Sequence, residues 1–187
     1  MKFLVLGDSH ARRMPSRFMT SSYSLIIKSI PGLKFIDYHD KKLSLLHLLF
    51  SSKIQYLLSE ADGIILLVGT NSVRIHSART IISQIEAIIF FIRKVYPKFN
   101  QRESITIPLS FPCVKTTRKF SKKYALISNI QFYNYRLYQL SFELNFNTID
   151  FRITSSQLAI DKMHIRRHYY YRIFNFLVKY LNNLTKN

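Results

Sequence analysis

The sequence predicts an α/β fold in which a parallel sheet lies between two layers of helices. Three observations indicate it: short apolar runs that suit buried strands, longer segments with apolar residues at helical spacing, and their alternation along 187 residues. Such alternation builds a parallel sheet covered by helices on both faces. We expect one domain over residues 1–187, because a chain of this length buries one sizeable core and is short for two.

Five strands are expected, and each is a short apolar run. The first covers residues 2–6 and ends at Gly7. The others are expected at residues 23–30, before Pro31-Gly32; at 63–68, before Gly69; at 105–109, before Ser110 to Pro112; and at 147–151.

The helices are expected between these strands and after the last one. A short helix is expected to begin near Ala11, directly after the first strand. Longer helices are expected over residues 42–58, 77–95, 122–144 and 166–184. Apolar residues recur at helical spacing in the second of these longer segments, namely Ile81, Ile85, Ile88, Ile89 and Ile92.

Cysteine content and hydropathy limit where the protein can work. Cys113 is the single cysteine, so no internal disulfide can form, which suits a reducing compartment. No apolar window approaches the roughly 18 residues that a spanning helix needs. The first strand is also shorter than the core of a secretory signal. We expect an intracellular, cytoplasmic protein without a transmembrane segment, with the nucleus as the alternative location.

The chain is strongly basic, with 28 Lys and Arg, 10 Asp and Glu, and a formal charge of +18. A surplus of this size attracts nucleic acid or other polyanions. Two stretches carry much of it, residues 115–123 and 162–172, and the second contains three tyrosines that could stack bases. A coding sequence rich in A and T would also enrich lysine, and solvated surface segments would look the same. The basic charge therefore has two open explanations: a polyanion partner, or coding bias together with ordinary solvated surface segments.

Polar residues follow several of the expected strands, where ligands bind in parallel sheets. The candidates are Gly7 to His10, Gly32, Gly69 to Asn71, Asp161 and His164. Catalysis by a serine needs a base, a carboxylate that orients the base, and donors for the developing oxyanion. All three kinds of group are present. No Cys/His spacing suits zinc, so no metal or cofactor is expected.

Each candidate also has a plainer structural interpretation. Asp8 or Ser9 could cap a helix, and so could Asn71 or Ser72. Gly32 lies in a Pro-Gly turn that needs no further role. His10 follows Ser9 directly, and adjacent side chains point apart, so we expect it to line the pocket or pack rather than act as the base.

Four separated blocks resemble the SGNH (GDSL-type) hydrolases. They are GDSH at residues 7–10, Gly32, GTN at residues 69–71, and DKMH at residues 161–164. The resemblance implies Ser9 as nucleophile, His164 as base and Asp161 as its orienting acid. It also implies that the Ser9 amide, the Gly32 backbone and the Asn71 side chain bind the oxyanion.

The resemblance covers nearly the whole chain and implies a flavodoxin-like, three-layer α/β/α fold with a parallel five-stranded sheet. It implies metal-free hydrolysis of a small ester, thioester or acylated sugar. The GDSH variant also resembles esterase-like domains carried by some retroelements. Residues 165–169 depart from the family, which usually has a Pro or Gly turn there. The alternative is therefore a weak or inactive SGNH-fold module that binds nucleic acid or another polyanion through its basic surface.

Overall fold

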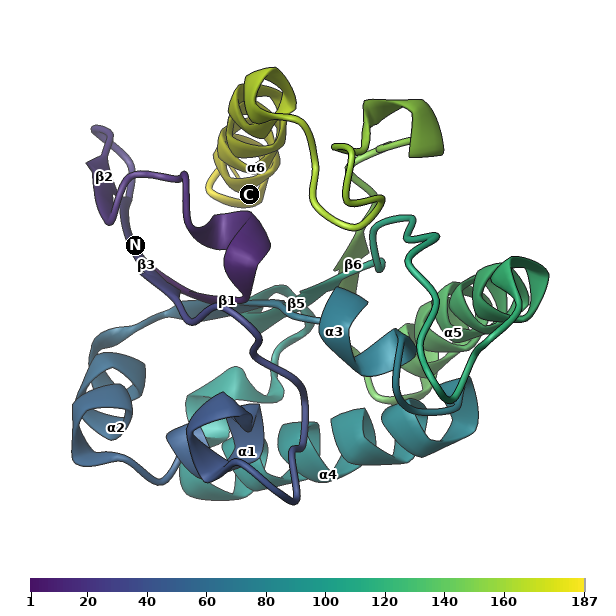
Figure 1. Cartoon of the computed structure of the whole chain (residues 1–187). Coiled ribbons are helices and arrows are strands. Elements are labelled where there is room, and N and C mark those ends of the chain that lie inside the picture. Colours follow the sequence, from purple (N-terminus) through teal and green to yellow (C-terminus); the bar gives the residue numbers. More distant parts are fainter. Residues whose placement is uncertain (187) are drawn as a thin grey trace.

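The structure is a computed structural model that describes residues 1–186, and its centre is a mixed sheet (Figure 1). Within these residues six strands lie in the order β2-β3-β1-β4-β5-β6. Their bounds are β1 Lys2–Gly7, β2 Arg17–Met19, β3 Ser24–Ser29, β4 Gly63–Leu67, β5 Ile105–Pro108 and β6 Asn147–Ile149. The five strands expected from the apolar runs are all present and parallel to one another. The predicted α/β class is therefore confirmed.

The prediction of a purely parallel, five-stranded sheet was wrong in one respect. A sixth strand, β2, pairs antiparallel with β3 at the edge of the sheet. β2 has only three residues, and its outer two are exposed, so no apolar run marks it in the sequence. The helix expected near Ala11 is a single 3-10 turn over Ser9–Ala11. Pro15 disfavours helical backbone at the residue before it, which leaves the chain free to return as β2.

Helices cover both faces of the sheet, as the sequence predicts (Figure 1). The α-helices are α1 Leu45–Leu48, α2 Ser52–Glu60, α3 Thr70–Val73, α4 Ala78–Val95, α5 Lys123–Glu143 and α6 Tyr170–Leu184. The 3-10 turns are Ser9–Ala11, Lys41–Leu43, Pro97–Asn100, Arg102–Ser104, Ser155–Gln157 and Arg167–Tyr169. The helix expected over residues 42–58 is broken, because the Ser51 side chain accepts the Ile54 N–H and starts α2 afresh.

Two apolar cores lie on the two faces of the sheet. Along β1, Leu4 and Leu6 pack into the core with α1, α2, α4 and α5, whereas Phe3 and Val5 pack into the core with α6. Fully burying such a side chain contributes about 1.5–3 kcal/mol. Alternate residues of one strand thus hold both helical layers against the sheet. Among the described helices, none has the length and apolar character that crossing a bilayer requires.

The carboxyl end of β1 is held tightly between its neighbours. The Ile30 N–H donates to the Gly7 carbonyl at 2.8 Å, and the Asp8 N–H donates to the Leu67 carbonyl at 3.1 Å. A Cβ at Gly7 would lie 2.6 Å from the Ala11 Cβ, so only glycine fits where the chain turns. This turn fixes the position of the residues that follow β1.

Candidate active site

Ser9 begins the 3-10 turn after β1, and its hydroxyl is left free of helix capping. Asp8 is the N-cap of this turn, because its carboxylate accepts the His10 N–H at 2.9 Å. The capping interpretation therefore holds for Asp8 and not for Ser9. The Ser9 Oγ instead lies 3.1 Å from the Nε2 of His164.

His164 is bonded on its other side to Asp161. Its Nδ1 lies 2.5 Å from one carboxylate oxygen of Asp161, and both side chains are 37% exposed. The second oxygen accepts the backbone N–H groups of His164, at 3.0 Å, and Met163, at 3.1 Å. Lys162 has a φ of 57°, which turns the loop so that these groups converge on one carboxylate. The structure thus brings Ser9, His164 and Asp161 into one hydrogen-bonded row.

The charge state of Asp161 follows from these bonds. Burial raises the pKa of this carboxyl, but the bonds from the His164 side chain and from the two backbone N–H groups outweigh it. Together they lower the pKa of Asp161 to about 2. Asp161 is therefore a carboxylate at neutral pH, and a carboxylate can only accept. Nδ1 of His164 must then carry a proton, so in the neutral ring the lone pair is on Nε2, which faces Ser9.

Asn71 lies inside α3, so it is not a helix cap. The N-cap of α3 is Gly69, and no side chain caps this helix. The Asn71 Nδ2 donates to Asp8 at 3.3 Å and to the Leu33 carbonyl at 3.4 Å. The Ser72 hydroxyl also does not cap α3, because it accepts the Phe35 N–H at 3.1 Å. The capping interpretations of Asn71 and Ser72 were therefore wrong.

Gly32 lies in the turn that precedes Leu33, with a positive φ of 85° that favours glycine. Because Asn71 is bonded to both Leu33 and Asp8, the structure brings this turn close to the end of β1. Among residues 1–186, neither the Gly32 N–H nor the Ser9 N–H donates a hydrogen bond. Two backbone donors and one side-chain amide thus come from segments next to Ser9.

The pairing of Asp8 with His10 was not predicted. The His10 ring is fully buried, its Nδ1 lies 2.9 Å from Asp8, and it packs on Phe111 with ring centroids 4.7 Å apart. The expectation that His10 packs was correct, but its polar contact was missed. The only signal in the sequence was the spacing Asp-x-His next to a candidate nucleophile.

The cationic side chain of Arg74 contacts the segment that carries Asp161 and His164. Arg74, at the C-cap of α3, places Nη1 3.0 Å from the Met163 sulfur and Nε 3.2 Å from the Lys115 carbonyl. The basic stretch at residues 115–123 is also joined to α3, because Thr117 donates its hydroxyl proton to the Arg74 carbonyl at 2.6 Å. At least the start of this stretch therefore borders the site.

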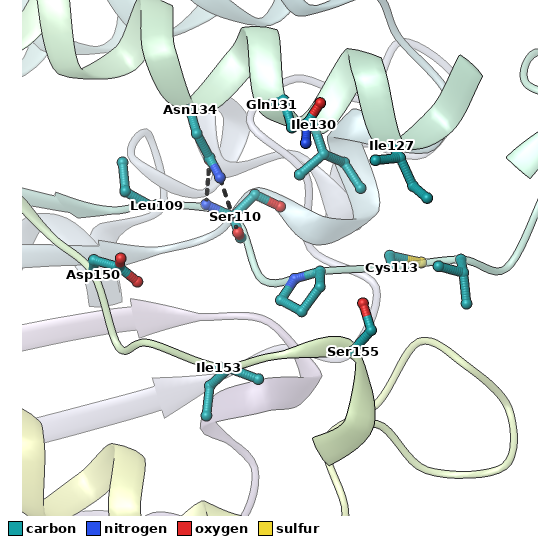
Figure 2. Close-up of a pocket in the computed structure, with 12 residues that line it drawn as sticks. Leu109, Ser110, Cys113, Ile127, Ile130, Gln131, Asn134, Asp150, Ile153 and Ser155 are labelled. Atoms are coloured by element: carbon teal, nitrogen blue, oxygen red, sulfur yellow. Dashed lines mark hydrogen bonds between the residues drawn. The ribbon is translucent and has the colours of Figure 1, made fainter. Parts of the chain in front are cut away.

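A pocket of about 300 Å³ lies beside the site, at the carboxyl ends of β5 and β6 (Figure 2). Its walls come from residues 109–114, α5 and residues 150–155. Asn134 of α5 holds Ser110 by two bonds, accepting its N–H at 2.8 Å and donating to its carbonyl at 3.3 Å. Cys113 lines this pocket, and Phe111 of the same stretch of chain packs on His10.

Comparisons with known proteins identify the fold. No protein-family model and no curated protein matches the chain. Solved structures do match, including a GDSL-like lipase from Bacteroides thetaiotaomicron, with 14% identity, a TM-score of 0.68, and coverage of 97% of this chain and 88% of the lipase. A carbohydrate acetylesterase family member from Sinorhizobium meliloti matches at 17% identity and a TM-score of 0.67, with 100% of both chains covered.

A lipase/acylhydrolase from Enterococcus faecalis matches in the same way, at 14% identity and a TM-score of 0.63, with 98% of this chain and 96% of the other covered. The architecture is therefore that of a three-layer α/β hydrolase. Within that class it is the SGNH hydrolase fold, so the resemblance predicted from the four sequence blocks is confirmed at the level of the fold.

Proposed function

We propose that the protein is a serine hydrolase that cleaves a small ester or removes an acyl group. The observation that carries this proposal is the hydrogen-bonded row from the Ser9 Oγ, through His164, to Asp161. A nucleophile, a base and a group that orients the base are what acyl transfer from a neutral ester requires. The shared fold supports the proposal.

In the acylation step, the Ser9 Oγ attacks the carbonyl carbon of the ester while its proton moves to the His164 Nε2. Asp161 stabilises the imidazolium that forms. The carbonyl π electrons move to oxygen, which gives a tetrahedral intermediate. When this collapses, the bond to the leaving oxygen breaks, and that oxygen takes the proton from His164. An acyl-Ser9 ester and an alcohol result.

In the deacylation step, a water molecule takes the place of the alcohol. His164 removes a proton from the water, whose oxygen attacks the acyl carbon, and the bond to the Ser9 Oγ then breaks. Ser9 takes its proton back from His164, and the acid leaves. Apart from the ester and this water molecule, each step uses only side chains and backbone groups of the protein.

The negative oxygen of each intermediate needs donors that are already in place. We assign this role to the N–H groups of Ser9 and Gly32 and to the Nδ2 of Asn71. Both hydrogens of Nδ2 are engaged in the free protein, at 3.3 Å and 3.4 Å. These are long bonds, so a charged oxyanion competes well for one of the hydrogens.

Covalent labelling tests the proposal without knowledge of the substrate. Wild-type protein should react with a fluorophosphonate probe and hydrolyse p-nitrophenyl acetate, and Ser9→Ala should lose both activities. Ser21→Ala, which changes an exposed serine, is the matched control and should behave as wild type. Equal labelling of Ser9→Ala, or a wild type that neither labels nor hydrolyses, would overturn the proposal. An inert Ser9 would favour the alternative of a polyanion-binding module.

A further inference from the structure

Asp8 is a buried carboxylate at which three donors converge. It is 1% exposed, and one oxygen accepts both the backbone N–H and the Nδ1 of His10, each at 2.9 Å. The other oxygen accepts the Asn71 Nδ2 at 3.3 Å. A buried carboxylate is costly without such partners, so these bonds fix how Asp8 is oriented.

Asp8 determines which end of the Asn71 amide points toward it. An asparagine side chain can rotate by 180° and exchange its NH₂ group with its oxygen. Asp8 and the Leu33 carbonyl can only accept, so both select the NH₂ group. When the oxyanion binds the Nδ2 hydrogen that otherwise bonds to the Leu33 carbonyl, the hydrogen bond between Asn71 and Leu33 is lost. Asp8 is then the partner that keeps the amide from rotating.

His10 holds Asp8 in this orientation. Because a carboxylate only accepts, the His10 Nδ1 must carry the proton that joins the pair. Among the described residues, the buried Nε2 of His10 has no hydrogen-bond partner. An unpartnered buried nitrogen destabilises a fold, and an apolar residue would fill the same space against Phe111 without that cost. The bond to Asp8 is therefore the contact that distinguishes histidine from leucine at this position.

We propose that His10 and Asp8 are positioning residues that hold the Asn71 amide ready to donate to the oxyanion. This inference rests on the proposed function, because it assumes that Asn71 donates in catalysis. His10 touches neither substrate nor Ser9 in this scheme and acts only through Asp8. It follows that the contribution of His10 should disappear when Asn71 is removed.

Paired variants of His10 test the inference on p-nitrophenyl acetate hydrolysis. His10→Leu keeps the volume but removes the side-chain donor, and it should lower kcat by about tenfold with KM little changed, a fraction of the cost of losing a whole oxyanion donor. His10→Asn restores an N–H at the same distance from the backbone and should recover most of the loss. His39→Leu, at an exposed histidine, is the control and should match wild type.

A double-mutant cycle then separates positioning from other effects. In an Asn71→Ala background, His10→Leu should change kcat by less than about twofold, because the two residues act as one unit. An unchanged kcat in His10→Leu alone, or the same tenfold loss in both backgrounds, would overturn the inference while leaving a Ser9-dependent hydrolase intact.

Hydrogen exchange of the Asn71 side chain tests the positioning role even if the protein has no hydrolase activity. In ¹⁵N-labelled protein, the side-chain NH₂ signal of Asn71 is identified by its loss in Asn71→Ala. Its hydrogens should exchange slowly with solvent in wild type and in His10→Asn, and at least about tenfold faster in His10→Leu. Equal exchange in all three proteins would refute the positioning role, whatever Ser9 proves to do.

Discussion

The ring centroids of His10 and His164 lie 5.8 Å apart, and the Nδ1 of each histidine is hydrogen-bonded to a different aspartate. The two Asp-His pairs differ in what the second ring nitrogen meets. The Nε2 of His164 faces the Ser9 hydroxyl, whereas the Nε2 of His10 is buried and has no partner among the described residues. Of the two histidines, only His164 therefore has a ring nitrogen within hydrogen-bonding distance of the Ser9 hydroxyl.

This difference predicts unequal effects of removing the two histidines. His164→Gln should lower kcat for p-nitrophenyl acetate by about 10⁴-fold or more, because the serine loses its base. The melting temperature should change little, since the His164 side chain is 37% exposed. His168→Gln, at an exposed histidine of the same segment, is the control for steady-state assays. A His164→Gln variant that kept a tenth of wild-type kcat would exclude His164 as the base.

Asn71→Ala should act mainly on the transition state. Loss of one oxyanion donor typically lowers kcat by about 10²–10³-fold, while KM changes little. The variant also leaves one Asp8 oxygen without its partner, so the free energy of unfolding should fall by about 1–3 kcal/mol. Steady-state kinetics and urea denaturation measure the two effects separately. A loss of stability with kcat intact would show that Asn71 serves the fold alone.

Much of this site could be predicted from the sequence, because its residues follow the carboxyl ends of parallel strands. The apolar run of β1 marked where Ser9 lies, and the run of β4 marked where Asn71 lies. Parallel neighbours in a sheet bring such ends together whatever their separation along the chain. The motifs then identified His164, although 155 positions separate it from Ser9.

The remaining features depend on contacts that no local pattern encodes. β2 is too short for an alternating pattern, and its pairing with β3 is decided by the turn between them. The break before α2 depends on whether one serine, Ser51, caps a new helix or continues the old one. The bond between Asp8 and Asn71 joins side chains 63 positions apart, so it became visible only when the strands were assembled.

The low pKa of Asp161, about 2 against 3.8 for a free side chain, predicts how stability depends on pH. A carboxyl whose pKa is lower in the folded protein stabilises it at pH values above the unfolded pKa. That stabilisation is lost as the pH falls from about 4 through about 2. The melting temperature of Asp161→Asn should therefore be lower than that of wild type at pH 6, and this difference should disappear toward pH 2. Melting curves across this range measure it, and a gap that stayed constant with pH would contradict the assignment.

The cations around the site predict a preference for anionic esters. Arg12 lies three residues after Ser9, Lys162 lies two before His164, and both are exposed. Asp8 and Asp161 lie in the same two segments and bind histidines, but the chain as a whole carries a formal charge of +18. The field that an approaching substrate meets is therefore positive, and it should raise the encounter rate with a negatively charged substrate.

Comparing two acetate esters tests this preference, one neutral and one with a sulfonate on its phenol ring. At low salt, kcat/KM for the sulfonate ester should fall by about twofold to fivefold in Arg12→Gln, and by a similar factor in Lys162→Gln. This is the effect expected when one charge is removed several ångströms from the sulfonate in water. The neutral ester should be unaffected by either change. Salt at 0.5 M should abolish the difference, because screening then acts within about 4–5 Å. Lys94→Gln, at an exposed site on α4, is the matched control. Equal values for the two esters, or a preference that salt leaves unchanged, would show that the field at the site plays no part in choosing the substrate.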